Sequence, residues 1–304
     1  MADSHSMADI RGIDIDKLAK GFADQEIKLK RFVTNSTTSA REIRWYQKTS
    51  GFVTGVTTTG ITGSPIANVP YGARPSVAEQ TWTRNTSYVR KYMVDSPMIT
   101  EEDIRDSDID IIAGNLRDLV RAVEHQVDSR IFDILINGGT AAGGTASYSG
   151  TNYNATNAAW DTASFTGVDI IEDLMEAKMN INVDGYDANG AVLLVNAYDH
   201  KQILTWLISN KGSSIPAFSS QKVETGVVME LLGLKVVVDE NVQVSAALVF
   251  VPQVAATWKQ FTPISSVQIP EPGIGTKIRT WEEGEAILTD PNAVNVIIGT
   301  RTTV

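Results

Sequence analysis

The sequence predicts an α+β protein, because one long amphipathic helix separates two regions with strand patterns and a stretch of alternating strands and helices follows it. The helix is predicted from about residue 107 to residue 137, since Ser107 and Asp110 suit its first turn and Gly138 and Gly139 suit its end. At 1.5 Å per residue it would be roughly 45 Å long, so we expect it to span the molecule. Apolar residues recur at every third or fourth position and form one stripe: Ile112, Leu116, Leu119, Val120, Val123, Val127, Ile131, Ile134 and Leu135.

The segment before residue 45 is the most basic part of an acidic chain. Residues 14–32 are predicted to form a short amphipathic helix, and residues 11–48 as a whole are rich in Lys and Arg. A solvated helix face is the simpler interpretation of this charge. The alternative is an arm that contacts nucleic acid or the acidic face of a neighbouring molecule.

Residues 45–93 form a long excursion with the composition of strands. Two runs of Thr, Val, Ile and aromatic residues are interrupted by glycines and separated by a stretch at 68–75 that is rich in turn residues. An isolated hairpin buries too little apolar surface to be stable by itself. The excursion therefore needs a partner surface, and we expect another copy of the chain to supply it.

The region after the long helix changes in character several times. A tract of small and polar residues up to about residue 159 is predicted to be a surface loop. Residues 183–258 are predicted to form a compact α/β unit, and the later strands are expected to fold back onto the long helix. The remaining predicted helices are 97–103, 168–180 and 198–209, and the predicted strands are 191–195, 227–238, 246–251, 267–269, 276–281, 286–288 and 293–298.

Composition excludes several classes of protein. The chain has 304 residues, 42% hydrophobic content and a net charge of −10, which is typical of a folded protein and unsuited to binding nucleic acid by phosphate neutralisation. It contains no cysteine, so a disulfide framework and thiolate metal sites are excluded. No apolar run approaches the length of a membrane span and the first residues lack the pattern of a signal peptide, so we expect no membrane partner.

Patterns for catalysis, cofactor binding and metal binding are absent from the sequence. The glycine-rich stretch at 138–145 lacks the lysine of a phosphate-binding loop. Residues 106–117 begin like a calcium loop, but Ile111 and Arg117 stand where glycine and glutamate are required. No Gly-x-Ser-x-Gly motif supplies a nucleophile. We therefore expect no enzyme activity, no cofactor and no metal, since the histidines also lack the spacing of metal ligands: His5, His125 and His200.

Several short stretches between residues 45 and 304 have a distinctive sequence and order: 95–102, 123–131, 135–138, 193–196, 231–237 and 290–294. These stretches, and the order of the predicted parts, resemble those of the major capsid proteins of tailed double-stranded DNA bacteriophages, which have the Hong Kong phage fold. The resemblance does not extend to the cleaved helical scaffolding segment of some members or to a lysine crosslink, for which no partners are assignable.

This resemblance implies a division of the chain into four parts. Residues 1–44 would be an N-terminal arm, and residues 45–96 an extended β-hairpin called the E-loop. Residues 97–182 and 259–304 would form a peripheral domain that contains the long spine helix. Residues 183–258 would form the central axial α/β domain.

The resemblance also implies a structural function. The chain would assemble into pentamers and hexamers of an icosahedral shell around phage double-stranded DNA, which it would not bind sequence-specifically. Portal and scaffolding or decoration proteins would be its partners, and it would be part of the virion after synthesis in the bacterial cytoplasm. Aromatic residues dominate interface energetics, so we expect the self-assembly interface to involve aromatic side chains of the excursion, with local packing as the alternative: Trp45, Tyr46, Trp82, Tyr88 and Tyr92.

Other functions stay open on the sequence alone. An encapsulin, which is a cellular compartment shell around a cargo enzyme, would share the fold and differ in its contents. A β-rich glycan-binding or adhesive protein is suggested by the tracts rich in Thr, Asn and Tyr, and would be a small monomer or trimer. A hydrolase that uses pairs of acidic residues is the third alternative, and turnover of a glycan or ester would reveal it.

Overall fold

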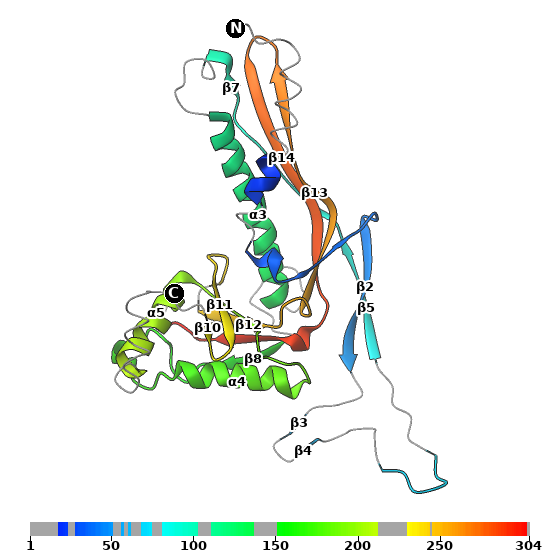
Figure 1. Cartoon of the computed structure of the whole chain (residues 1–304), viewed down its shortest axis with the longest axis vertical. Coiled ribbons are helices and arrows are strands. Elements are labelled where there is room, and N and C mark those ends of the chain that lie inside the picture. The colour runs from blue at the N-terminus through cyan, green and yellow to red at the C-terminus, as the bar shows by residue number, and fades with distance from the viewer. Residues whose placement is uncertain are drawn as a thin grey trace.

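The molecule is long, with a compact unit at one end (Figure 1). Helix α3 (Ile111–Ile136) lies beside a long hairpin made of β13 (Ala256–Glu271) and β14 (Gly275–Leu288). The compact unit contains α4 (Ile170–Val183) and α5 (Ala197–Trp206) and lies at the C-terminal end of α3. This computed structural model describes residues 18–23, 28–50, 56–57, 60–61, 68–74, 81–102, 111–136, 151–211, 230–243 and 245–302.

Helix α3 is the long helix that the apolar periodicity predicts, and its described part has 26 residues. The first half packs against a helical segment at 18–23, in a cluster that also contains Ile264 and Ile278 of the hairpin. The predicted cap at Ser107 and the predicted stop at Gly138 lie outside the described residues. The predicted stripe faces inward, since its central members are fully buried: Leu116, Val120, Val127, Ile131 and Leu135.

The first sheet has five strands and runs along α3. Strands β13 and β14 pair antiparallel along their whole length, with irregular register between Gln260 and Ser265. On the other edge of β14 lie β6 (Arg90–Asp95) and the short β7 (Ile99–Thr100), both antiparallel to it. Strand β1 (Thr34–Thr37) pairs parallel with β13 and forms the opposite edge.

The hairpin is more continuous than the sequence predicts. Three short strands are expected at 267–269, 276–281 and 286–288, whereas β13 and β14 have 16 and 14 residues. Charged residues interrupt the apolar pattern of β14, so this part of the sequence resembles a polar turn. These carboxylates are instead buried and paired with Lys or Arg from other segments: Glu282, Glu283 and Glu285.

The second sheet lies in the compact unit and has six strands in the order β10-β11-β9-β12-β15-β8. Two pairings are parallel, β11 with β9 and β15 with β8, and the others are antiparallel. Leu232 and Gly233 have positive φ angles of 55° and 77° and form the two-residue turn that divides the predicted strand 227–238. The strands are β8 (Asn152–Ala155), β9 (Val192–Val195), β10 (Glu230–Leu231), β11 (Leu234–Val238), β12 (Ala246–Phe250) and β15 (Val294–Ile298).

The strand pairing differs from the predicted division of the chain in two places. The sequence analysis assigns the residues up to about 159 to a surface loop, and residues 97–182 and 259–304 to the domain around the long helix. In the structure, β8 and β15 pair within the second sheet and α4 covers that sheet. Short apolar runs do not reveal which of two sheets they join, because that depends on pairing partners far away in sequence. The four-part division itself stays an interpretation.

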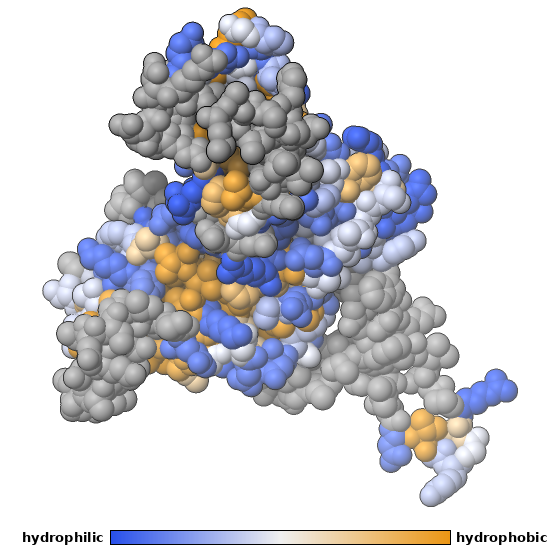
Figure 2. All heavy atoms as spheres, turned by 45° about the horizontal axis from the view of Figure 1, so that its top comes forward, coloured by the Kyte–Doolittle hydropathy of each residue, from blue (hydrophilic) through white to orange (hydrophobic). Residues whose placement is uncertain are grey.

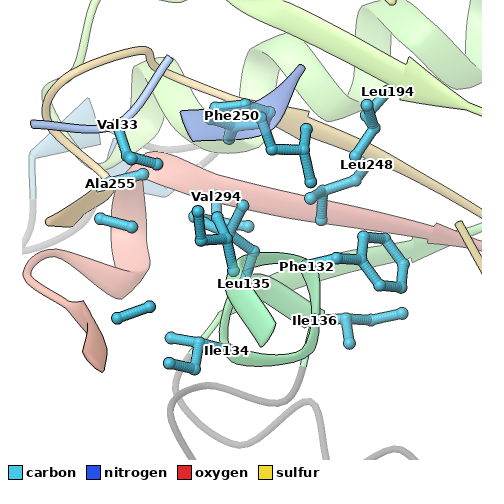
Figure 3. Close-up of a cluster of buried hydrophobic side chains, with 14 of the residues drawn as sticks. Val33, Phe132, Ile134, Leu135, Ile136, Leu194, Leu248, Phe250, Ala255 and Val294 are labelled. Carbon is cyan, nitrogen blue, oxygen red and sulfur yellow. The ribbon is translucent and has the colours of Figure 1, made fainter. Parts of the chain in front are cut away.

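Each face of the second sheet has its own core. On one face, Leu248, Phe250 and Val294 pack against the last turns of α3, where Leu135 is fully buried (Figure 3). On the other face, α4 and α5 enclose a cluster around Trp206. The first of these cores also contains residues of the hairpin, so it joins α3 to both sheets.

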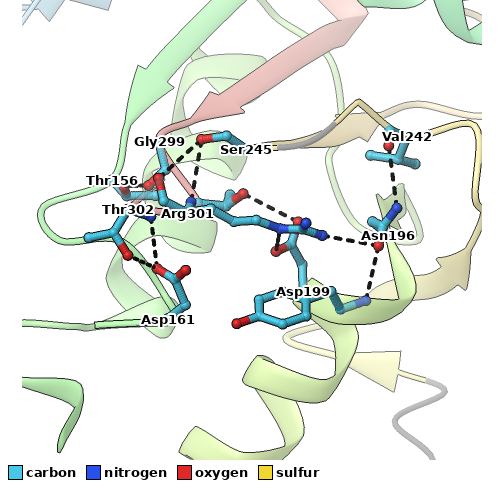
Figure 4. Close-up of polar contacts among 11 residues, drawn as sticks. Thr156, Asp161, Asn196, Asp199, Val242, Ser245, Gly299, Arg301 and Thr302 are labelled. Atoms are coloured by element: carbon cyan, nitrogen blue, oxygen red, sulfur yellow. Dashed lines mark hydrogen bonds and ion pairs between the residues drawn. The ribbon is translucent and has the colours of Figure 1, made fainter. Parts of the chain in front are cut away.

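The end of the chain is fixed to the compact unit by a C-terminal strap, which we define as residues 299–302 (Figure 4). Arg301 donates from Nε to Asp199 Oδ1 at 3.0 Å and from Nη2 to Asn196 Oδ1 at 3.0 Å. Its guanidinium lies 4.3 Å from the ring centroid of Tyr198. Thr300 donates to the second oxygen of Asp199, which is fully buried. The strap therefore attaches to α5 through a buried carboxylate.

The remaining described elements are two small sheets and several helical turns. Strands β2 (Glu42–Ser50) and β5 (Thr81–Tyr88) form a two-stranded ribbon at the side of the molecule, which is the hairpin that the sequence predicts. Beyond it, β3 (Val56–Thr57) pairs with β4 (Gly60–Ile61). Figure 2 shows a small group of described residues, both hydrophilic and hydrophobic, set apart from the body at its lower right. The turns are η1 (Leu29–Arg31), η2 (Ala163–Phe165), the π-helical η3 (Leu207–Lys211) and η4 (Pro291–Ala293).

Candidate functional site

The ribbon β2–β5 is the candidate site, because it carries most of the predicted interface residues and projects from the body (Figure 1). Its strands pair antiparallel, with Glu42 opposite Tyr88 and Tyr46 opposite Arg84. Residues directly opposite each other in an antiparallel pair lie on the same face, and successive residues alternate between faces. The register therefore decides which aromatic residues lie together.

The outer face of the ribbon is exposed and combines aromatic rings with cations. Tyr46 and Tyr88 have 58% and 67% of their surface exposed. Arg44 lies between them on the same face and donates from Nε to Glu42 Oε1 at 2.9 Å, a contact that raises the pKa of the arginine. Exposed Arg84 lies opposite Tyr46. This face offers two rings and two guanidinium groups to a partner, a composition common at protein interfaces.

The inner face of the ribbon packs toward the body. Ile43 is buried, and Trp45 is half-buried against the core that surrounds the end of α3. The indole Nε1 of Trp45 donates to Ser87 Oγ across the ribbon at 3.0 Å. Local packing, the alternative interpretation of the predicted interface residues, therefore describes Trp45 best.

Of the other two predicted interface residues, Tyr92 lies outside the ribbon and Trp82 lies within it. Tyr92 belongs to β6 and is partly buried between two cores, where burial raises the pKa of its hydroxyl to about 12. The backbone of Trp82 pairs with Lys48 in the ribbon, but its side chain lies outside the described residues. The structure thus brings Tyr46 and Tyr88 together and separates them from Trp45 and Tyr92.

The base of the ribbon is held to the body by charge. Arg41 Nη2 lies 3.7 Å from Glu283 Oε2 on β14, and the guanidinium lies 5.1 Å from the ring centroid of Phe261. Lys91 Nζ also lies 3.3 Å from Glu283, and Arg90 Nε lies 3.1 Å from Glu285. The sequence analysis identifies the basic character of 11–48 but assigns no role to Arg41, Arg44 or Arg84. A strand register would have been needed to place these cations beside the tyrosines.

A second exposed surface lies on the compact unit. A hollow of about 530 Å³ is lined by apolar and polar side chains of α4 and by Leu232. Lys178 crosses it and donates from Nζ to the carbonyl oxygen of Leu232 at 2.8 Å and to Asn189 Oδ1 at 3.2 Å. The two methionines of this hollow, Met175 and Met179, are 58% and 54% exposed.

The described residues contain neither a group of metal ligands nor a membrane-spanning helix. Among them, no three His, Cys, Asp or Glu side chains gather as metal ligands. His125 is exposed on α3, burial lowers the pKa of His200, and His5 lies outside the described ranges. Within those ranges, no helix has the length and hydropathy required to cross a bilayer.

Comparison with solved structures finds the same fold in capsids. The chain superposes on a virus-like particle protein from Pyrococcus furiosus with a TM-score of 0.62 and 10% identity, covering 94% of this chain and 99% of that one. The capsid structure of cyanophage P-SCSP1u gives a TM-score of 0.64 and 10% identity, covering 90% of this chain and 88% of that one. A structure from Mycobacterium phage Che8 gives 0.56 and 18%, covering 86% of each chain. A comparison with curated proteins found no significant match.

The fold is therefore that of capsid subunits, as the sequence analysis predicts. A family described as phage capsid protein matches residues 98–294, which is more than half of the chain. The chain belongs to the phage capsid protein family. It is a structural component of a phage particle, and the expected α+β capsid fold is confirmed.

Proposed function

We propose that copies of this chain associate as pentamers and hexamers and close an icosahedral shell around double-stranded DNA. Its role in that shell is structural and not catalytic. Portal and scaffolding or decoration proteins complete the particle, which is assembled in the cytoplasm of a bacterial host. The family assignment supports this function over a cellular compartment shell and over a glycan-binding protein.

The observation that carries the proposal is the exposed outer face of the ribbon. A two-stranded ribbon has too little apolar surface to be stable alone, and this one leaves Tyr46 and Tyr88 in solvent. Placed on a neighbouring copy, both rings become buried and the ribbon gains the packing that a single subunit does not supply. Arg44 and Arg84 give this face a positive charge that suits a copy of an acidic chain.

The experiment is electron microscopy and sedimentation of the full-length protein with substitutions on the outer face. The double variant Tyr46→Ala, Tyr88→Ala should fold and fail to form shells, because the anchors of the interface are lost. The matched control Tyr46→Phe, Tyr88→Phe keeps both rings and should still form shells. Normal shells from the alanine variant would contradict the proposal.

The contents of the particle test the second half of the proposal. Purified shells should protect double-stranded DNA from nuclease and contain no enzyme in stoichiometric amount. A shell filled with a protein cargo and free of DNA would instead indicate a cellular compartment. A protein that stays a small monomer or trimer under all conditions would contradict the proposal and favour the glycan-binding interpretation.

A further inference from the structure

An acidic slot is buried between α3, β13 and β14. Glu124 of α3 and Glu282 of β14 line it and are 1% and 0% exposed. Lys30, from η1, enters the slot and places Nζ 2.6 Å from Glu282 Oε1 and 3.6 Å from Glu124 Oε1. One ammonium group thus faces two carboxylates in a site closed to water.

The backbone of the same N-terminal segment docks one turn further along α3. Asp128, 3% exposed, accepts hydrogen bonds from the amides of Lys28 at 3.1 Å, Leu29 at 3.3 Å and Lys30 at 3.2 Å. The side chain of Leu29 is fully buried in the core at the end of α3. Residues 28–30 are therefore anchored by both backbone and side chains, and we call them the anchor segment.

The charges in the slot do not balance. Glu282 Oε1 accepts hydrogen bonds from Lys30 and from Gln260 Nε2, the latter at 3.3 Å. The other oxygen of Glu282 and both oxygens of Glu124 accept no hydrogen bond from the part of the chain that the structure describes. A buried carboxylate without a partner is costly, and the usual remedy is to take up a proton. Lys30 compensates one negative charge, so the second requires a proton.

The surroundings of Glu124 favour its protonated form. Burial raises the pKa of Glu124 to about 8, and the carboxylates of Glu282 and Asp128 act in the same direction against the opposing effect of Lys30. Burial also raises the pKa of Asp128 to about 6, with Asp239 adding to the effect. The charged and titratable groups facing the slot are Lys30 on η1, Asp128 on α3, Glu282 on β14 and, beyond it, Tyr92 on β6 beside the Arg130–Glu285 pair.

We propose that docking of the anchor segment depends on a proton bound by Glu124, so that the N-terminal segment is held at neutral and acidic pH and released in alkaline solution. The direction follows from the burial of acids. An acid whose pKa is higher in the docked state adds stability that is complete below its ordinary value of 4.5 and disappears as the pH rises to about 8. Alkaline pH removes the proton and leaves two buried carboxylates beside one ammonium group.

Hydrogen exchange on the full-length protein tests the proposal. The amides of Lys28, Leu29 and Lys30 should be protected at about pH 6.5, and their protection, corrected for intrinsic exchange, should fall about tenfold or more by about pH 9. In Glu124→Gln the side chain needs no proton, so protection should no longer depend on pH in this range. Glu283→Gln is the matched control, because Glu283 follows Glu282 in β14 but pairs with Lys91 and Arg41, and should behave as the unchanged protein.

Two results would overturn the proposal. One is protection of these amides in the unchanged protein that stays constant from about pH 6.5 to about pH 9. The other is a Glu124→Gln variant that loses protection at alkaline pH like the unchanged protein. If this variant does not fold, infrared spectroscopy of the unchanged protein gives an independent answer. A protonated carboxyl band that is present near neutral pH and lost at alkaline pH supports proton-dependent docking of the anchor segment. The absence of that band contradicts it.

Discussion

Gly284 lies in β14 at a position with no space for a side chain. A Cβ atom at this position would lie 2.4 Å from Cζ2 of Trp258 and 2.9 Å from the carbonyl oxygen of Lys259. Trp258 is fully buried in the core that joins both sheets, so it has no space to withdraw. The glycine is required by this close approach of side chain and backbone.

Gly284→Ala should therefore destabilise the protein by about 2 kcal/mol, since overpacking a filled core forces side chains and backbone apart. Gly114→Ala is the contrasting change, because Gly114 is exposed within α3 and no atom lies within 4 Å of the added Cβ. This second variant should gain about 0.5–1 kcal/mol from helix propensity. Urea denaturation of the unassembled chain measures both, and equal effects of the two substitutions would contradict the packing argument.

The ribbon shows what residue types alone leave undecided. The sequence predicts that aromatic residues of the excursion form an interface, but position along the strands decides which face of the ribbon each one lies on. Tyr46 and Tyr88 alternate onto the exposed face, whereas Trp45 faces the core. The register that separates them depends on the pairing of two strands about 40 residues apart in the sequence. Amino-acid composition does not reveal this register.

Among the elements, the C-terminal strap is attached by a group of polar contacts around Asp199. Burial raises the pKa of Asp199, and the hydrogen bonds from Arg301 and Thr300 oppose that effect. The guanidinium of Arg301, at 3.0 Å, supplies the counter-charge of this buried carboxylate. The strap thus stabilises α5 through one ion pair that is nearly closed to solvent.

Arg301→Ala should cost about 3 kcal/mol, because removing one partner leaves Asp199 buried without a counter-charge. Arg301→Lys should recover only part of this loss, since an ammonium group lacks the planar fork that reaches Asp199 and Asn196 together. Thr302→Ala, which removes an exposed contact with Asp161, is the control and should cost less than about 1 kcal/mol. Thermal unfolding of the three variants measures their stabilities and ranks them. A lysine variant as stable as the unchanged protein would contradict the role of the fork.

The helices of this chain are easier to predict from the sequence than its sheets. The periodicity of α3 is local, so the stripe of buried residues is readable without knowing the fold. Strand β14 is different, because Glu282, Glu283 and Glu285 make it resemble a polar turn. Their counter-charges come from Lys30, Lys91 and Arg130, which lie far away in the sequence. Only the folded chain shows that these acids are neutralised inside a strand.

On the scale of the whole molecule, the end of α3 is where the two sheets meet. One core contains Leu135 of α3 and Phe250 of the second sheet (Figure 3). Leu288 of the hairpin belongs to the same core. The core on the far side of the second sheet contains no residue of α3. The long hairpin, the compact unit and the last turns of α3 therefore share one core.

Leu135→Ala should destabilise both sheets together, by about 3 kcal/mol, because it opens a cavity in their shared core. Leu174→Ala removes a side chain of the same type from the far core alone and should affect the second sheet more than the hairpin. Hydrogen exchange of amides in β9 and β14 reports on the two sheets separately. Loss of protection in only one sheet of the Leu135→Ala variant would show that the units are energetically independent.

The contact between Lys30 and Glu282 joins residues 252 positions apart, and this separation has a consequence for synthesis. The N-terminal segment leaves the ribosome first and finds its slot only after β14 has been made. The second sheet likewise cannot be completed before β15 is synthesised, and Asp199 of α5 has no ion pair before Arg301 is synthesised. A truncated product therefore has an undocked N-terminus, an incomplete sheet and a buried acid without its partner. Docking of the N-terminal segment, completion of the second sheet and pairing of Asp199 therefore all follow the synthesis of residues 282–301.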